Sequence, residues 1–164
     1  GHPARGLIQC PIKSDFDWFE SAEGNRFFEA ADEPGLIASL ALGPSWQPAL
    51  RQLAMRFPRV PFLCHHMAGA RAGEDPPYPN VKGILRPVEV SWDYPHFDAH
   101  WIARELCGQF GPHRLCWGDY PVVRTNMTYQ HALEAFRTHC SIPEPDRERI
   151  LGTNLQGLLD QAGK

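Results

Sequence analysis

Two histidines and an aspartate each follow a short apolar segment that could form a buried strand. His65 and His66 come directly after the segment 60–64, and Asp119 comes shortly after the segment 114–117. A carboxylate can bind a metal or take a proton from water, and an imidazole can ligate a metal or polarise a carbonyl group. These side chains suit hydrolytic chemistry if the fold brings them to one place.

Each of these residues also has a purely structural interpretation. A single Asp after a strand is a common N-cap of the turn that follows it. An isolated pair of histidines usually divides between surface and core. Because neighbouring residues on a strand point to opposite faces, only one of His65 and His66 can face the same centre as Asp119. The residue types alone leave open which histidine does so.

The elements that must position these residues alternate in type along the chain. Short apolar runs typical of buried strands alternate with segments whose apolar residues recur at helical spacing. The predicted strands lie at 6–10, 36–42, 60–64, within 81–90 and at 114–117. The predicted helices lie at 26–32, 48–57, 97–110, 128–138, 146–151 and 154–159, with the last two separated at Gly152. The segments 13–19 and 68–80 are expected to be loops.

This alternation predicts one domain, residues 1–164, with parallel strands joined by crossover helices. A doubly wound open sheet and a part of a barrel both fit. In either fold, reactive side chains gather where the strands end and the next loops begin. The glycine-rich signatures GxGxxG and GxxxxGK[ST] do not occur in the sequence, which disfavours a nucleotide-binding sheet.

Composition narrows the possible partners. The formal net charge is −3 with no long basic run, which argues against nucleic acid and anionic membranes. No stretch reaches the roughly 18 to 20 apolar residues of a membrane span. The five cysteines form no CxxC pair, so neither a zinc ribbon nor a redox dithiol is indicated. We expect reduced thiols in a cytoplasmic protein.

Five motifs occur in the order in which amidohydrolase-2-type enzymes carry them. They are LAMRFP at 53–58, HHMAG at 65–69, PNVK at 79–82, FGPHRLCWGDYP at 110–121 and ILGTNLQGLL at 150–159. Together they run over most of the chain, and the ordered set is specific. The sequence therefore resembles this family.

The resemblance implies a (β/α)8 TIM barrel that catalyses hydrolysis, often of lactones, or in one branch decarboxylation. The matched motifs belong to the last strands of that barrel, and the family's N-terminal HxH motif has no counterpart here. We therefore expect the C-terminal half of the barrel, about five parallel strands with flanking helices. Because such a barrel needs eight strands, we also expect a homo-oligomer or pairing with a missing N-terminal half.

The resemblance also implies site residues. His66 matches the histidine of the family's DHmG motif, and Asp119 matches the aspartate of its GSDyP motif; His65 stands where the family has Asp. Asp119 would be the general base that activates water on a lactone or related carbonyl substrate, and His66 would polarise the carbonyl. Arg86 and Arg124, near strand ends, would bind a substrate carboxylate.

Three departures bear on cofactors. The segment 36–42 offers no His where metal-dependent members have one, Gly118 adjoins Asp119 without the family's serine, and the span 69–79 is short. We expect no metal in this chain alone, and zinc or manganese, with Asp119 and His66 as ligands, in a metal-dependent complete enzyme. Two alternatives stay open: a non-catalytic remnant or subunit, and a decarboxylase of the same family.

Overall fold

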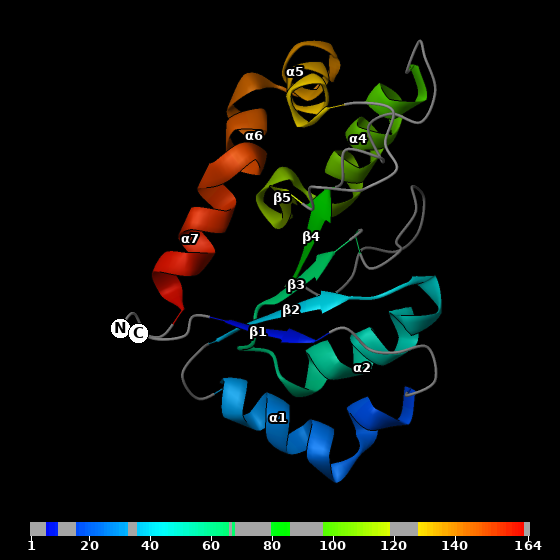
Figure 1. Ribbon diagram of the computed structural model, residues 1–164, viewed down its shortest axis with the longest axis vertical. Coiled ribbons are helices and arrows are strands. Elements are labelled where there is room, and N and C mark those ends of the chain that lie inside the picture. The colour runs from blue at the N-terminus through cyan, green and yellow to red at the C-terminus, as the bar shows by residue number, and fades with distance from the viewer. Residues whose placement is uncertain are drawn as a thin grey trace.

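A parallel sheet runs through the middle of the structure (Figure 1). The computed structural model describes residues 6–9, 16–32, 36–65, 67, 80–85, 97–118 and 128–162. Within these residues the strands lie in the order β1-β2-β3-β4-β5, and every neighbouring pair is parallel. Their bounds are β1 (Gly6–Gln9), β2 (Ile37–Ala41), β3 (Phe62–His65), β4 (Val81–Leu85) and β5 (Leu115–Trp117). The predicted parallel α/β fold is confirmed, whereas the assignment of the sheet to a partial barrel of about five strands stays a prediction.

Helices follow most of the strands, as the alternating pattern predicts. The α-helices are α1 (Ala22–Asp32), α2 (Gln47–Arg56), α4 (Phe97–Phe110), α5 (Tyr129–His139), α6 (Glu144–Glu148) and α7 (Asn154–Gln161). Shorter 3-10 turns are η1 (Phe16–Glu20), η2 (Pro44–Trp46) and η4 (Pro112–Arg114), and η5 (Arg149–Thr153) is π-helical. None of the helices in the described part of the chain combines the length and apolarity needed to cross a membrane.

The first helical segment differs from the sequence prediction. The expected loop at 13–19 contains the turn η1, and α1 begins four residues before the expected start at Arg26. Ser21 explains both, because its hydroxyl donates to Trp18 O (2.7 Å) and accepts from Gly24 N (3.0 Å), capping the first turn of α1. The predicted break at Gly152 was wrong: α6, η5 and α7 follow one another without interruption.

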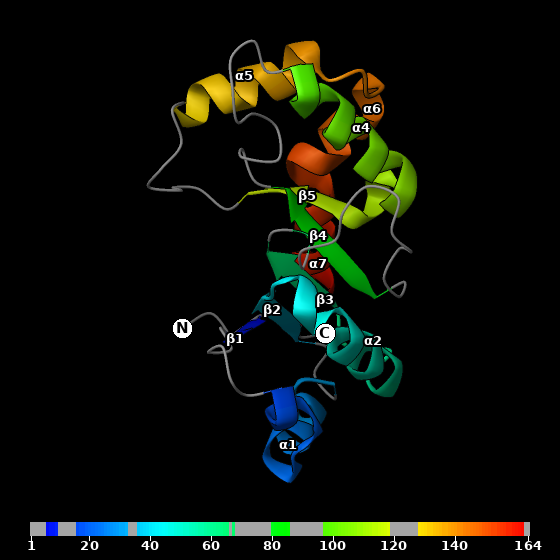
Figure 2. The ribbon, with the colours of Figure 1, turned by 90° about the vertical axis from the view of Figure 1, so that its right-hand side faces the viewer.

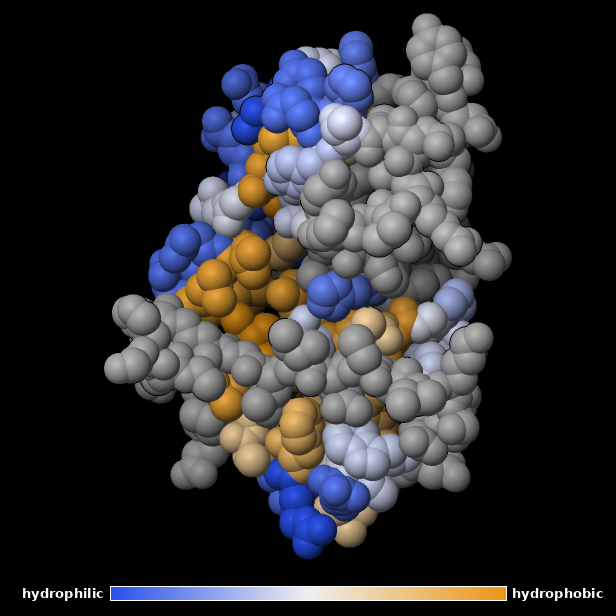
Figure 3. Space-filling model, in the orientation of Figure 1, coloured by the Kyte–Doolittle hydropathy of each residue, from blue (hydrophilic) through white to orange (hydrophobic). Residues whose placement is uncertain are grey.

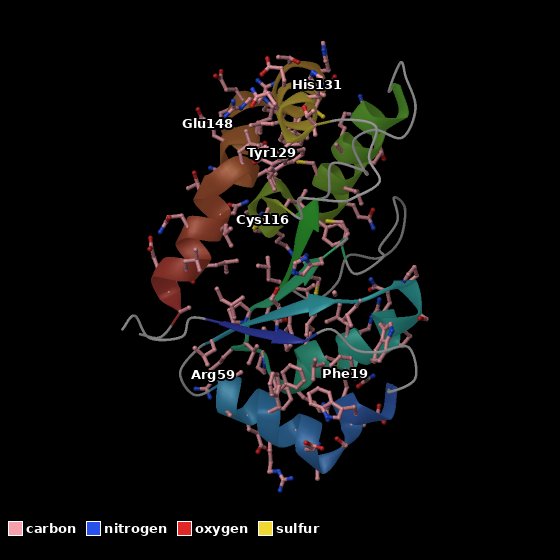
Figure 4. All side chains as sticks on the ribbon, viewed as in Figure 1. Phe19, Arg59, Cys116, Tyr129, His131 and Glu148 are labelled. Atoms are coloured by element: carbon pink, nitrogen blue, oxygen red, sulfur yellow. The ribbon has the colours of Figure 1, made fainter. Side chains whose placement is uncertain are left out.

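One face of the sheet packs against α1 and α2. Ala38 and Leu40 of β2 and Phe62 and Cys64 of β3 belong to this cluster. Aromatic rings join it from the helices and from η1, most of them edge-on to one another. Figure 4 labels one of them, Phe19, which is almost completely buried. Because neighbouring side chains of a strand point to opposite faces, the odd-numbered positions of β2 lie on the other face of the sheet.

A second cluster covers the same side of the sheet at its β5 end. Leu115 and Trp117 of β5 pack with residues of α4 and α5 and with Ile150 of η5. The Trp117 and Phe136 rings lie 4.8 Å apart between centroids. Figure 2 shows α1 and α5 at opposite ends of the molecule, with the strands between them. The two clusters together give the sheet an outer, helix-covered face.

The other face of the sheet, here called the inner face, meets only α7 among the described helices. Ile37, Leu63 and Cys116 of three different strands form a small buried cluster there with Ala162. Three partly buried leucines of α7 pack against it: Leu155, Leu158 and Leu159. Figure 3 shows apolar surface in this region, left of the centre of the view. Among the described residues, the inner face is thus less completely covered than the outer one.

Side-chain donors bind backbone carbonyls near the amino-terminal ends of β3, β4 and β5. Asn80 Nδ2 lies 3.1 Å from both Phe57 O and Val60 O, just before β3. Arg114 Nε donates to Val81 O (3.2 Å) at the start of β4. Asn154 Nδ2 donates to Pro112 O (2.7 Å) and to Leu115 O (2.8 Å), which ties α7 to β5. These bonds join backbone carbonyl groups at this edge to side chains of neighbouring segments.

The described cysteines are reduced and buried. Burial raises the pKa of the Cys64 thiol to about 12. Burial also raises the pKa of Cys140 to about 11, although the charge of Arg147 partly opposes this. The pKa of Cys107 is raised mainly by burial and to a smaller extent by the negative charge of Asp146. These thiols therefore serve as core residues rather than nucleophiles.

Replacing Asn154 should destabilise the protein. Asn154→Ala removes both bonds to the η4 and β5 carbonyls and leaves two part-buried acceptors without these donors. We expect a loss of about 2 kcal/mol in the free energy of unfolding, measured by urea denaturation. Gln156→Ala on the same helix is the matched control, because its amide binds only the exposed Asp160. Equal midpoints for the two variants would contradict the anchoring role.

The buried thiols should resist alkylation in the folded state. At pH 8 a pKa of about 12 leaves a very small thiolate fraction, so iodoacetamide should modify Cys64 at least ~100-fold more slowly in native protein than in urea. The pKa of Cys64 in the folded state lies above the ordinary value of 9.0, so folding favours the protonated thiol. The contribution of this thiol to the free energy of unfolding is therefore complete below pH 9 and decreases as the pH rises toward 12. Peptide mapping by mass spectrometry measures the rates, and similar rates in both states would disprove burial of this thiol.

Candidate functional site at the carboxyl ends of the strands

The carboxyl ends of neighbouring strands meet at one edge of the sheet. Ala41, the last residue of β2, pairs with His65, the last residue of β3. His65 pairs in turn with Ile84, and Leu85 at the end of β4 pairs with Trp117 at the end of β5. This edge is the place where parallel α/β folds carry their reactive side chains.

The structure settles which face of the sheet His65 occupies. Phe62 and Cys64 lie on the outer face, so Leu63 and His65 lie on the inner one. By the same alternation, Ser39 of β2 lies on the inner face between Ile37 and Ala41. His65 is therefore an inner-face imidazole, a question that the sequence had left open.

Ser39 and His65 are in direct contact. Ser39 Oγ lies 2.9 Å from His65 Nε2, within hydrogen-bond distance, and both residues are half-buried. Sequence reasoning considered His65 but missed Ser39. A signal was present, because Ser39 is the single polar residue in the apolar run 36–42. A hydroxyl inside a strand that is otherwise apolar needs a polar partner, and the imidazole of the next strand provides it.

The residues predicted to carry the chemistry lie outside the described part of the chain. These are His66, Asp119, Arg86 and Arg124. Their positions along the sequence are nevertheless tied to described elements. His66 follows directly after β3, Arg86 directly after β4, and Asp119 follows Gly118, one residue beyond the end of β5. Their roles remain predictions.

The backbone turns sharply just beyond the two histidines. Met67 has a φ of 57°, in the left-handed region that non-glycine residues rarely adopt. Its side chain is buried, and it packs where Gly83 of β4 lacks a side chain: a Cβ on Gly83 would lie 2.3 Å from Met67 Sδ. The contact packs the side chain of Met67, two residues beyond the end of β3, against β4.

The described residues do not supply a metal site. Among them, no three His, Cys, Asp or Glu side chains gather closely enough to hold a metal ion. The inner-face positions of β2 carry Ile37, Ser39 and Ala41, none of which is an imidazole or a carboxylate. His65 is one donor where a catalytic zinc site needs about three. The described donor set alone therefore does not fit a zinc or manganese ion.

A surface cavity lies elsewhere, among the helices. Its volume is about 480 Å³, and it lies between α5, α6 and η5. Its charged lining consists of Arg137, Arg147, Glu144 and Glu148, whose formal charges cancel. It contains none of the predicted site residues, so the strand edge remains the candidate functional site.

Comparison with solved structures supports the fold. A protein described as a 2-pyrone-4,6-dicarboxylic acid hydrolase from Pseudomonas putida matches with a TM-score of 0.76 and 16% identity, over 96% of this chain and 63% of that chain. An amidohydrolase from Burkholderia multivorans with bound zinc matches with a TM-score of 0.79 and 13% identity, over 98% of this chain and 66% of that one.

A third structure adds a different reaction. A dihydroxybenzoic acid decarboxylase from a Polaromonas species, with bound manganese and the inhibitor 2-nitroresorcinol, matches with a TM-score of 0.61 and 15% identity, over 87% of this chain and 55% of that one. This chain thus spans less than two thirds of the length of each of these proteins. At such low identity the likeness shows the fold alone, that of TIM-barrel amidohydrolases.

The sequence itself shows the family. A search of curated proteins found no match. The sequence profile of the amidohydrolase family, in contrast, matches residues 6–155, which is nearly the whole chain and includes all five strands. The match also spans the motifs around β3, β4 and β5 on which the resemblance was based. The chain belongs to the amidohydrolase family.

Proposed function

We propose that this chain forms part of an amidohydrolase barrel that hydrolyses a lactone or a related carbonyl substrate. The proposal rests on the adjacency of the carboxyl ends of three strands. β3, β4 and β5 end side by side at one edge, and the sequence continues from them into His66, Arg86 and Asp119. Family membership supports the reaction class, because relatives with this fold include a hydrolase and a decarboxylase.

Asp119 is the group proposed to activate water. It would accept a proton as a water molecule attacks the carbonyl carbon, and the ring C–O bond would then break to give a carboxylate and an alcohol. His66 would polarise the carbonyl, and Arg86 and Arg124 would bind a carboxylate on the substrate by paired hydrogen bonds. Two of the similar solved structures hold zinc or manganese, and a divalent metal at such a centre would supply Lewis-acid chemistry in a complete enzyme.

Removing the carboxylate of Asp119 tests the proposal. Asp119→Asn keeps the size of the side chain but cannot accept the proton, so kcat for lactone hydrolysis in the full-length protein should fall at least ~100-fold. The assay follows proton release against a panel of lactones, with and without a carboxylate substituent. Arg137→Gln, on a charged surface away from the strand edge, is the control and should keep full activity. Unchanged turnover in Asp119→Asn would rule out its role as general base, whereas absence of turnover in the unaltered protein would favour the non-catalytic alternative.

We also propose that further strands complete the sheet. In the described sheet β1 pairs only with β2 and β5 pairs only with β4, so each presents an edge to a possible neighbour. The leucines of α7 leave apolar surface on the inner face, which closure of a barrel would cover. A second copy of the chain or additional strands of a longer protein could supply these neighbours.

The 164-residue chain by itself should therefore associate. Sedimentation velocity across a concentration series is expected to show dimers or larger species, because burial of the edges and of the inner face favours assembly. Leu158→Glu on α7 would place a charge on this apolar surface and should weaken the association, whereas Glu148→Gln on exposed α6 should not. A monomer at every concentration would rule out this assembly.

A further inference from the structure

The cavity between α5, α6 and η5 has no part in the proposed hydrolysis. Its volume of about 480 Å³ lies in the range that is typical of small-molecule sites in proteins. Its walls come from helices that pack against the outer face of the sheet, where Phe136 of α5 and Ile150 of η5 belong to one buried cluster. The shape of the cavity is therefore set without residues of the inner face.

The helix that lines this cavity changes its geometry there. Residues Arg149–Thr153 form a π-helical turn between two α-helical segments, and Leu151, Gly152 and Thr153 of this turn line the cavity. A π-helical turn is rare, and it is found frequently at functional sites. A Cβ on Gly152 would meet no atom within 4 Å, so the wall is open at this position, next to the half-buried Leu151.

The charged groups of the lining are not paired with one another. Arg147 is half-buried, and within the described part of the chain it has neither a hydrogen bond nor an ion pair. Glu144, one turn earlier on α6, is exposed and has no ion pair with another described residue. The Thr153 side chain makes no capping bond to α7. A partly buried charge without a partner is costly, so a ligand that supplies the partner would bind favourably.

The chemistry of the lining indicates the kind of ligand. The formal charges of the cavity cancel, so a zwitterion complements it better than an anion or a cation does. A guanidinium group binds a carboxylate through two parallel hydrogen bonds, and a glutamate accepts hydrogen bonds from an ammonium group. Leu151 adds an apolar contact surface. A free α-amino acid with an apolar side chain carries all three complementary groups.

We propose that this cavity binds a free α-amino acid with an apolar side chain. The carboxylate of the ligand accepts hydrogen bonds from the Arg147 guanidinium and the Thr153 hydroxyl, and its ammonium group donates to Glu144. The apolar side chain of the ligand lies against Leu151 and fills the open space at Gly152. The site is separate from the strand edge, so this proposal does not depend on the hydrolysis proposed there.

A ligand-observed NMR titration of the 164-residue chain tests the class of ligand. The probes are L-leucine, L-methionine and L-phenylalanine. Each probe is compared with its amide, which lacks the carboxylate, and with its deaminated acid, which lacks the ammonium group. We expect both analogues to bind at least ~10-fold more weakly than the amino acid, because each loses charge-assisted hydrogen bonds.

Two outcomes of this titration would overturn the proposal. Equal binding of an amino acid and its deaminated acid would show a site for carboxylates in general rather than for a zwitterion. Absence of binding by all three amino acids at concentrations up to about 10 mM would show that the cavity does not bind this class of ligand.

Variants connect the binding to the cavity. Arg147→Gln should weaken amino-acid binding at least ~10-fold, because the partner of the carboxylate is lost. Gly152→Leu should abolish binding by filling the open space. Gly157→Leu on α7 is the matched control, since a Cβ there also meets no atom within 4 Å but Gly157 does not line the cavity. Urea denaturation shows that each variant is folded, and unchanged binding by folded Arg147→Gln or Gly152→Leu would contradict the proposed site.

Discussion

The arrangement of the strands depends on a few side-chain donors that bind backbone carbonyls near the amino-terminal edge of the sheet. Asn80 binds the connection between α2 and β3, Arg114 binds the first residue of β4, and Asn154 joins α7 to β5. A buried carbonyl group without a hydrogen-bond donor is costly, so side-chain donors at such groups are stabilising. These three residues join the starts of the later strands to neighbouring segments.

The residues that stabilise the sheet and the residues that could carry chemistry lie at opposite edges of the sheet. The amino-terminal edge is bound by amide and guanidinium groups, and burial lowers the pKa of Arg114 there without leaving it unbonded. The carboxyl edge carries Ser39 and His65 on its inner face and continues into His66 and Asp119 in sequence. Parallel α/β folds separate the two roles in the same way, so loops can change at one edge without loosening the other.

The two faces of the sheet also differ in how far other side chains cover them. On the outer face, aromatic and aliphatic side chains of α1, α2, α4 and α5 bury the strands in two large clusters. On the inner face only α7 is present among the described helices, and its three leucines are partly exposed. Apolar side chains on an incompletely covered face favour association with further protein. In a closed TIM barrel, the inner positions of the strands form the packed centre. The likeness to TIM barrels therefore suggests that the inner face of this sheet corresponds to such a centre.

The sequence by itself determined the order of strands and helices, the parallel sheet and the family, because hydrophobic periodicity and ordered motifs are local features of the chain. It could not assign the faces at the end of β3, since a shift of one residue exchanges His65 and His66. The sequence marks Ser39 as the single polar residue of an apolar run, but it could not identify its partner, which lies 26 residues away. Only the register between β2 and β3 decided both points: it brings the hydroxyl and the imidazole onto one face at hydrogen-bond distance. Such contacts between distant residues depend on the packed sheet and leave no local pattern.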